Sequence, residues 1–256
     1  MITVGIDIGS ITTKAAILKN GNLILEQIIP TGYNAEKAAL SIYKKILSDM
    51  NFDPTQIHAV VTTGYGRKSA SFADRTVTEI MCHAAGAHFM NPSIRSVIDI
   101  GGQDSKAIVI DESGTVKDFA MNDKCAAGTG RFLEVMARAM EINLSDFGEF
   151  SLQAENPAKI SSLCTVFAES EVISLISSGE KRENIIAGIH QSISSRVMAM
   201  AGRIGITAPV MMTGGVAKNI GVVRAIEEKS GKKIEISEKA QVAGAIGAAI
   251  VAAKGK

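Results

Sequence analysis

The chain has 256 residues, which is enough for one large domain or two compact ones. Its 27 basic and 26 acidic side chains leave a formal net charge of +1, which offers no electrostatic footprint for nucleic acid or an anionic membrane. With 46% hydrophobic and 21% charged residues, the composition is that of a folded globular protein and excludes a disordered chain.

Targeting and redox signals are weak. No basic region followed by an apolar stretch opens the sequence, and the longest apolar run, Val242 to Ala253, is shorter than the about 20 residues that span a membrane. We therefore expect a cytoplasmic protein without a membrane segment. Three cysteines, at 82, 125 and 164, are too few and odd in number for a disulfide framework, so we interpret them as thiols.

Hydrophobic periodicity predicts an α/β chain. In the first half it predicts strands over 2–8, 15–18 and 23–29, a helix over 34–50, a strand over 57–61, a helix over 76–90, a strand over 94–100, and a hairpin of 106–110 with 116–121. The second half is more helical, with helices over about 130–140, 165–176 and 183–204, a strand over 209–212, a helix from about 218, a strand over 233–236 and a helix over 240–253.

The first half contains an internal repeat. A shift of 92 positions places Asp7-Ile-Gly9 on Asp99-Ile-Gly101 and Lys14-Ala15 on Lys106-Ala107, with apolar residues matching on both flanking strands. Each copy is thus a strand that ends in Asp, a glycine-containing polar turn, and a Lys that enters the next strand. Two such turns facing each other would form a clamp.

The chemistry of the two turns favours a Mg²⁺-nucleotide triphosphate. Successive backbone N–H groups in a glycine turn can bind phosphate oxygens, and Asp7 and Asp99 are hard oxygen ligands for Mg²⁺. Further hydroxyl and ammonium groups are available to phosphates on Ser10, Thr12, Thr13, Ser105, Lys14 and Lys106. A single copy would be read as an ordinary β-turn, and the registered duplication makes that alternative weaker.

A third glycine element follows a buried strand at Pro209 to Thr213. Its Gly214-Gly215 pair lets a nucleoside and its α-phosphate approach the backbone and the next helix N-terminus closely. By itself this pattern is equally consistent with a plain strand-to-helix turn.

These segments carry a family resemblance. Asp7 to Lys14, Asp99 to Lys106 and Thr213 to Asn219 resemble the phosphate and adenosine elements of the acetate and sugar kinase, Hsp70 and actin superfamily. Together with Lys124-Cys-Ala-Ala-Gly-Thr-Gly-Arg131, the chain resembles the ATP-dependent activators of 2-hydroxyacyl-CoA dehydratases, of the BadF/BadG/BcrA/BcrD type, over essentially its whole length.

The resemblance implies an actin-like ATPase fold of two duplicated lobes, each with a mixed β-sheet flanked by helices, and a nucleotide in the cleft between them. The first lobe would take residues 1–95, to which the C-terminal helix 240–256 could be added, and the second residues 96–239 with the cysteine-bearing helices. It implies nucleotide contacts from Gly9, Ser10, Ile11, Thr12, Thr13, Lys14, Gly101, Gly102, Gln103, Ser105, Lys106, Gly214, Gly215 and Lys218.

For catalysis we assign Asp7 and Asp99 to Mg²⁺ and its waters. Gln103 is the candidate for orienting the attacking water, by analogy with other nucleotidases, while Asp104 could instead act as the base. These two assignments are alternatives at this stage.

Members of this family are homodimers that share one 4Fe-4S cluster between subunits, and the resemblance implies Cys125 and Cys164 as its ligands. The count is consistent, because the chain lacks a Cys-x2-Cys-x2-Cys run and two cysteines from each of two chains supply four thiolates. We predict both cysteines at helix N-termini, which favour an anionic group. Buried free thiols are the plainer alternative, and we prefer it for Cys82.

The activity implied is an electron-transfer ATPase of anaerobic amino-acid fermentation. Reduced ferredoxin or flavodoxin would supply an electron, which ATP hydrolysis would drive into the dehydratase, component D. The rival is a sugar or N-acetylhexosamine kinase on the same fold, for which Asp104 would be the base and the cysteines would have no task. A filament-forming actin relative is disfavoured by the short chain.

The remaining sequence features give less information about function. The four histidines, at 58, 83, 88 and 190, are scattered and we expect them to be structural. Rossmann and P-loop patterns are absent. Gly64-Tyr-Gly66 is interpreted as a turn or an interface loop, and Glu169 and Glu171 as a solvated helix face.

Overall fold

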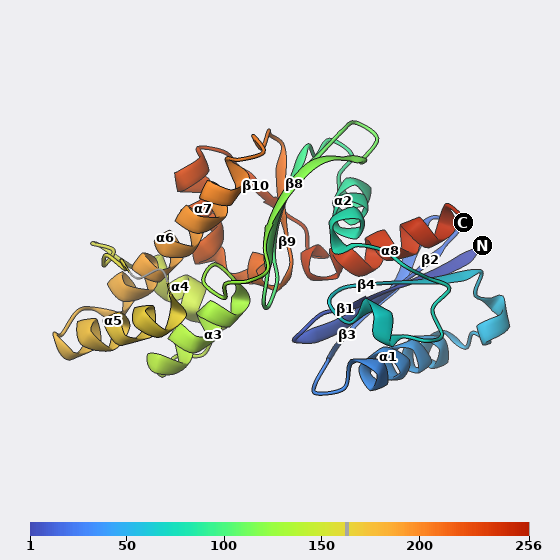
Figure 1. Ribbon diagram of the computed structural model, residues 1–256, viewed down its shortest axis with the longest axis horizontal. Helices are drawn as coiled ribbons and strands as arrows, with labels where there is room; N and C mark the ends of the chain where they lie inside the picture. Colours follow the sequence, from blue (N-terminus) through green and yellow to red (C-terminus); the bar gives the residue numbers. More distant parts are fainter. Residues whose placement is uncertain (162–163, 256) are drawn as a thin grey trace. The chain divides into compact units, whose positions relative to one another are not determined.

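A computed structural model describes residues 1–161 and 164–255. The chain divides into two compact units (Figure 1). Unit 1 comprises Met1–Val97, Ile110–Lys117 and Ser237–Lys256, and unit 2 comprises Ile98–Val109 and Asp118–Ile236. In the described part of the chain, no helix is both long enough and apolar enough to cross a membrane.

The first sheet has five strands in the order β3-β2-β1-β4-β5. They are β1 (Ile2–Ile8), β2 (Thr12–Lys19), β3 (Asn22–Pro30), β4 (Ala59–Thr63) and β5 (Arg75–Thr76). The sheet is mixed, since β1 pairs antiparallel with β2 and parallel with β4. This register places Asp7 opposite Lys14 on one side and opposite Thr63 on the other.

Helices cover both faces of this sheet (Figure 1). Helix α1 (Ala35–Met50) lies on one face, and the Asn34 side chain caps it by accepting from the Lys37 N–H. Helix α8 (Ala243–Ala253) lies on the other face, with α2 (Glu79–Met90) packed against it. The contact of α8 with β1 requires Gly5, because a Cβ there would overlap the α8 backbone at Ala245 and Ala249.

The second sheet repeats the first. Its order is β10-β9-β6-β7-β8, formed by β6 (Ser96–Ile100), β7 (Ser105–Ile110), β8 (Val116–Asn122), β9 (Val210–Thr213) and β10 (Ile234–Ile236). Written from β8, the order is β8-β7-β6-β9-β10, which matches the order β3-β2-β1-β4-β5 of the first sheet strand for strand. The repeat found in the sequence therefore extends to the whole sheet, including β4 and β9.

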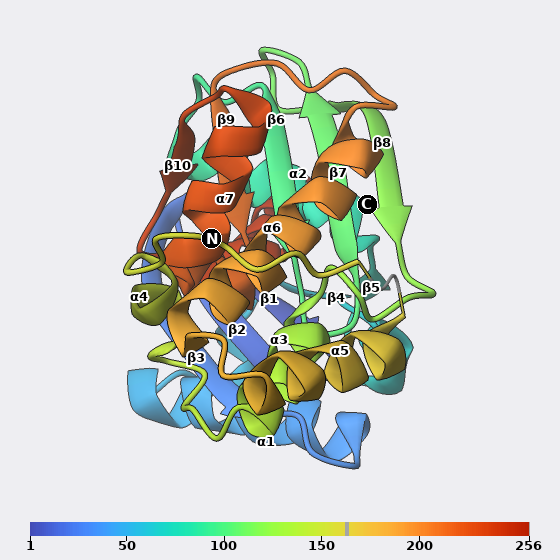
Figure 2. The same ribbon diagram turned by 90° about the vertical axis from the view of Figure 1, so that its left-hand side faces the viewer.

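Unit 2 carries most of the remaining helices: α3 (Gly130–Ala139), α4 (Phe147–Ser151), α5 (Thr165–Ser177), α6 (Arg182–Ala201) and α7 (Ile220–Ser230). Helices α6 and α7 pack against each other, and α7 contacts β10 (Figure 2). Single 3-10 turns occupy Pro54–Gln56, Arg67–Ser69, Gly215–Lys218 and Ala240–Val242.

The predicted elements are present, with shifted ends in places. β4 starts at Ala59 and not at 57, because Ile57 still closes the 3-10 turn Pro54–Gln56 by donating its N–H to the Pro54 carbonyl. Helix α2 starts at Glu79 and not at 76, since Thr78 is its N-cap. The two-residue strand β5 and the short helix α4 were not predicted, because neither is long enough to show a period.

Candidate functional site

The first predicted phosphate turn, Gly9 to Thr12, joins β1 to β2. The Gly9 N–H donates to the Thr12 carbonyl at 3.1 Å and closes the turn. Beneath it, Lys14 Nζ lies 3.1 Å from Asp7 Oδ2, and the two side chains are 14% and 6% exposed. Ser10 and Thr12 are half-buried and Ile11 is exposed, so the turn presents its outer edge to solvent above a buried ion pair.

Thr13 lies on the inner side of this turn. Its side chain is buried, and its Oγ1 is 2.9 Å from Thr31 Oγ1, which donates to the Gly9 carbonyl at 2.7 Å. The hydroxyl that we predicted to face phosphate thus braces the turn from behind. Thr31 was missed, and its only sequence signal is a hydroxyl directly after the β3 proline.

Replacing Thr31 by Val should lower the free energy of unfolding by about 1–3 kcal/mol, because the part-buried Gly9 carbonyl loses its hydroxyl donor while the side-chain volume is kept. Urea denaturation measures this difference. Thr115→Val, in an exposed turn, is the control and should change stability by less than about 0.5 kcal/mol. Equal stability of the two variants would show that the brace contributes nothing.

The second predicted turn, Gly101 to Asp104, repeats the first. The Gly101 N–H donates to the Asp104 carbonyl at 2.9 Å, the same bond as in the first turn. Lys106 Nζ lies 3.2 Å from Asp99 Oδ2 and 2.8 Å from Asp104 Oδ2. Because the Lys106 side chain is 1% exposed, its charge balances two carboxylates within the protein. Gln103 is exposed at the tip of the turn, whereas Ser105 is buried on β7.

Each copy also has a Thr-Gly step behind its aspartate. Thr213 Oγ1 donates to Asp99 Oδ1 at 3.0 Å, and Thr63 is the register neighbour of Asp7. Gly64 and Gly214 have φ of +92° and +86°, and a Cβ at either would clash with the carbonyl of Ile8 or Ile100, respectively. Gly64 is therefore the counterpart of Gly214 and not a plain turn residue. The signal was Thr-Gly after an apolar strand in both halves.

The predicted adenosine element leads directly into α7. Gly215 to Lys218 form a 3-10 turn, on which Gly215 and Lys218 are exposed. Asn219 ends this turn and caps α7, accepting from the Val222 N–H at 3.1 Å. The helix therefore starts two residues later than predicted, because the 3-10 turn occupies the intervening positions.

Cys125 is half-buried in the segment between β8 and α3. The Asn122 side chain holds it on both sides: Nδ2 donates to the Cys125 carbonyl at 2.7 Å, and Oδ1 accepts from the Cys125 N–H at 3.2 Å. Our placement of Cys125 at a helix N-terminus is wrong, since α3 begins five residues later at Gly130.

The N-terminus of α3 binds the second turn. The Gly130 and Arg131 N–H groups donate to the carbonyls of Gly101 and Gly102, both at 2.8 Å. A Cβ on Gly130 would lie 3.1 Å from the Gly101 oxygen, so a larger residue there would press on the turn. The start of α3, which follows the segment that carries Cys125, is thus hydrogen-bonded to the second turn within unit 2.

Cys164 is exposed and is the N-cap residue of α5, as predicted. Exposed apolar side chains follow it on that helix, with Val166 65% and Phe167 67% exposed. Glu171 does not merely face solvent: its carboxylate accepts from the N–H and Oγ of Ser161 at 2.9 to 3.1 Å, on the chain that leads towards Cys164.

Cys82 has the structural role that we expected. It is fully buried, and burial raises the pKa of its thiol to about 12, which keeps it protonated and unreactive. Within the described residues, no three His, Cys, Asp or Glu side chains come together in a way that could hold a metal ion.

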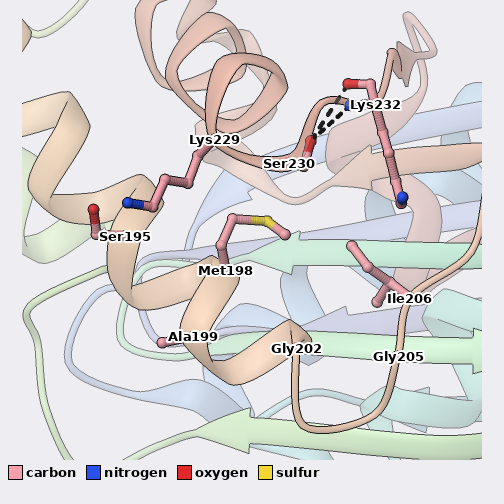
Figure 3. A pocket seen from close by; sticks show the side chains of 9 residues that line it. All are labelled: Ser195, Met198, Ala199, Gly202, Gly205, Ile206, Lys229, Ser230 and Lys232. Carbon is pink, nitrogen blue, oxygen red and sulfur yellow. Dashed lines mark hydrogen bonds between the residues drawn. The ribbon is translucent and has the colours of Figure 1, made fainter.

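A surface pocket of about 580 Å³ lies apart from these turns (Figure 3). It is formed at the C-terminal ends of α6 and α7, whereas the Gly214-Gly215 turn precedes the N-terminus of α7. Met198 and Ile206 supply apolar surface to the lining, and Lys229 and Lys232 supply ammonium groups. None of the predicted site residues lines it.

Comparison with known proteins decides the family. Residues 4–252 match the BadF/BadG/BcrA/BcrD ATPase family. The chain belongs to this family. It is 49% identical to the activator of lactoyl-CoA dehydratase from Anaerotignum propionicum, over 98% of this chain and 97% of that protein. The predicted resemblance is confirmed.

Solved structures agree with this membership. The activator of the 2-hydroxyisocaproyl-CoA dehydratase from Clostridium difficile, solved with bound ADPNP, superimposes with a TM-score of 0.92 and 45% identity, covering 98% of this chain and 94% of that one. A ROK family glucokinase from Streptomyces griseus shares the fold alone, with a TM-score of 0.63 and 15% identity over the full length of both chains. The predicted actin-like class, mixed sheets flanked by helices, is confirmed for this BadF/BadG/BcrA/BcrD ATPase.

Proposed function

We propose that this chain hydrolyses Mg²⁺-ATP to activate a 2-hydroxyacyl-CoA dehydratase in the cytoplasm, by transferring one electron from reduced ferredoxin or flavodoxin. The observation that carries the proposal is the duplicated Asp-turn-Lys arrangement in a chain 45% identical to an activator solved with ADPNP. Two relatives at this similarity are activators of lactoyl-CoA and 2-hydroxyisocaproyl-CoA dehydratases, which share the 2-hydroxyacyl-CoA substrate class.

In this proposal both turns and the adenosine element serve one nucleotide. The outer N–H groups of the turns, with Ser10, Thr12, Gly215 and Lys218, meet the nucleotide, and Asp7 and Asp99 hold Mg²⁺ through its waters. Gln103, exposed at the tip of the second turn, is better placed to orient water than Asp104, whose carboxylate is paired with Lys106. The predicted lobes, 1–95 with 240–256 and 96–239, remain part of the proposal.

The residues around the two cysteines fit a shared 4Fe-4S cluster. Cys164 is exposed at the start of a helix whose apolar side chains have solvent on one side, and a second copy of the chain would cover both. Asn122 fixes the backbone of Cys125 without using its thiol. Such a cluster supplies one-electron chemistry, and two subunits would supply four thiolates. We therefore propose a homodimer.

Coupling between nucleotide and cysteines would pass through the α3 N-terminus. A nucleotide can shift a conformational equilibrium only through contacts that differ between its states. The γ-phosphate is such a contact at the second turn, whose Gly101 and Gly102 carbonyls hold the first amides of α3. Movement of the turn would then reach Cys125 along the same short segment.

Gly130→Ala should weaken this coupling, since its Cβ would press on the Gly101 carbonyl. We expect iron content and ATP affinity to equal those of the wild type. The measured quantity is the rate at which a chelator removes iron, and the ratio of this rate with ATP to the rate with ADP should fall at least about fivefold. Gly202→Ala is the matched control, because its Cβ meets the Met198 carbonyl at 3.2 Å at a helix end remote in sequence from the turn. A wild-type ratio in Gly130→Ala would contradict this route.

The experiment that tests the function is iron and sulfide analysis, an absorption spectrum and the solution mass of anaerobically purified protein. We expect about four irons per dimer and a charge-transfer absorption that bleaches in air. A colourless monomer that phosphorylates a sugar with ATP would instead establish the small-molecule kinase.

A further inference from the structure

A side-chain contact with the buried His190 holds the start of α7. Asn219 Oδ1 accepts from the Val222 N–H at 3.1 Å, and its Nδ2 lies 3.4 Å from His190 Nε2 on α6. His190 is 1% exposed, and the Phe147 ring meets it edge-on with ring centres 5.6 Å apart. Asn219 is therefore at once the last residue of the Gly214 to Asn219 turn, the cap of α7 and the neighbour of a buried imidazole.

These contacts determine the proton positions. The cap bond requires Asn219 Oδ1 to face α7, so the Nδ2 donor faces His190. A hydrogen bond between the two side chains then requires His190 Nε2 to accept, which assigns the ring proton to Nδ1. Burial lowers the pKa of His190 to about 3, so the ring stays neutral and Nε2 stays an acceptor at physiological pH.

The far side of the imidazole is closed around Gly221. Within the described residues, His190 Nδ1 has no hydrogen-bond partner, and Ser151 Oγ, which donates to the Gly148 carbonyl at 2.7 Å, lies on the same side of Gly221 as this nitrogen. A Cβ at 221 would overlap both Ser151 Oγ and His190 Nδ1. A Cβ at 148 would press on Asn219 Oδ1 at 3.0 Å. Gly148 and Gly221 thus leave the space in which the Asn219 and His190 side chains meet.

We propose that His190 is a positioning residue for nucleotide binding, acting through Asn219. The inference rests on the proposed function, in which the Gly214 to Asn219 turn meets the adenosine part of ATP. A core histidine kept only for packing would be replaceable by an apolar ring, whereas this one supplies the acceptor that sets the Asn219 amide. Rotation of that amide would release the α7 cap and the last residue of the turn together.

The test compares His190→Ala, His190→Gln and Asn219→Asp by steady-state ATPase kinetics. In the alanine variant we expect KM for Mg²⁺-ATP to rise about fivefold, the loss typical of one helix N-cap, with kcat and iron content unchanged. The glutamine variant should recover most of the loss, because its amide oxygen can accept from Asn219. Asn219→Asp keeps the cap acceptor, replaces the amide donor to His190 by a charged carboxylate oxygen, and should raise KM similarly.

Val197→Ala, a buried apolar truncation on α6, controls for general destabilisation and should lower the melting temperature without changing KM. Unchanged KM in both His190→Ala and Asn219→Asp would overturn the inference. Where His190→Ala does not fold, the other two variants decide. Unchanged KM in Asn219→Asp then overturns the inference, whereas a rise in KM in Asn219→Asp but not in His190→Gln supports it. Wild-type protein that neither binds nor hydrolyses ATP would instead contradict the proposed function.

Discussion

Replacing Asp99 by Asn should reduce Mg²⁺-dependent ATP hydrolysis about a thousandfold. A bound metal contributes several kcal/mol to stabilising transferred phosphoryl charge, and each 1.4 kcal/mol is about tenfold in rate. Asp99 is buried, accepts from Thr213 and pairs with Lys106, so its carboxylate is held in one place. Asn keeps its shape and the Thr213 contact, and Lys106 keeps Asp104 as a charged partner. The rate loss should therefore appear in folded protein.

Phosphate release, measured with and without Mg²⁺, gives the rate, and circular dichroism confirms the fold. Asp7→Asn should show the same loss, because Asp7 has the equivalent place above Lys14 in the first turn. Asp49→Asn, which removes an exposed carboxylate paired with Lys45 on α1, should hydrolyse ATP at the wild-type rate. Wild-type rates in both Asp7→Asn and Asp99→Asn would remove the magnesium assignment.

Replacing either Cys125 or Cys164 by Ser should abolish the cluster, because loss of one residue removes two of the four ligands in a symmetric dimer. Iron content should fall from about four per dimer to near zero, and the visible absorption should disappear with it. Nucleotide binding should persist, since neither thiol takes part in the contacts that shape the turns.

Iron analysis after anaerobic reconstitution, together with calorimetric titration of ADP, measures both properties. Cys82→Ala is the control, because this thiol is fully buried and protonated, and its variant should keep full iron content. Full iron in both serine variants would exclude these cysteines as ligands. Loss of both iron and ADP binding would indicate a folding defect and would contradict the prediction that the cluster and the nucleotide site are separate.

The sequence predicted those features that depend on neighbouring residues. Asp7 and Lys14, or Asp99 and Lys106, are joined by one hairpin turn, so a local pattern locates them. The glycine turns followed from the same pattern, because each is closed by a bond between residues three apart. The family resemblance rested on these short segments and was confirmed.

Features set by distant contacts were not predicted. Thr213 reaches Asp99 across 114 residues, and Thr31 reaches Gly9 across 22. Lys106 also pairs with Asp104, whose side chain lies close to Gly101, and the sequence position of Asp104 does not indicate this contact. The same holds for the docking of α3 on the second turn. Side-chain partners of this kind depend on the tertiary fold and not on local propensity.

Helix α8 belongs to unit 1 but is synthesised after unit 2, which affects how unit 1 folds. Its residues Ala243–Ala253 cover β1, β2 and β4 and pack on α2, yet they are translated after every strand and helix of unit 2. During synthesis, the face of the first sheet that α8 covers therefore lacks this helix while unit 2 is being translated. Such long-range closure is slow and leaves nascent sheet surface open to aggregation. Synthesis of unit 1 begins before that of unit 2 and is completed after it, so the final packing of unit 1 has to wait until α8 has emerged.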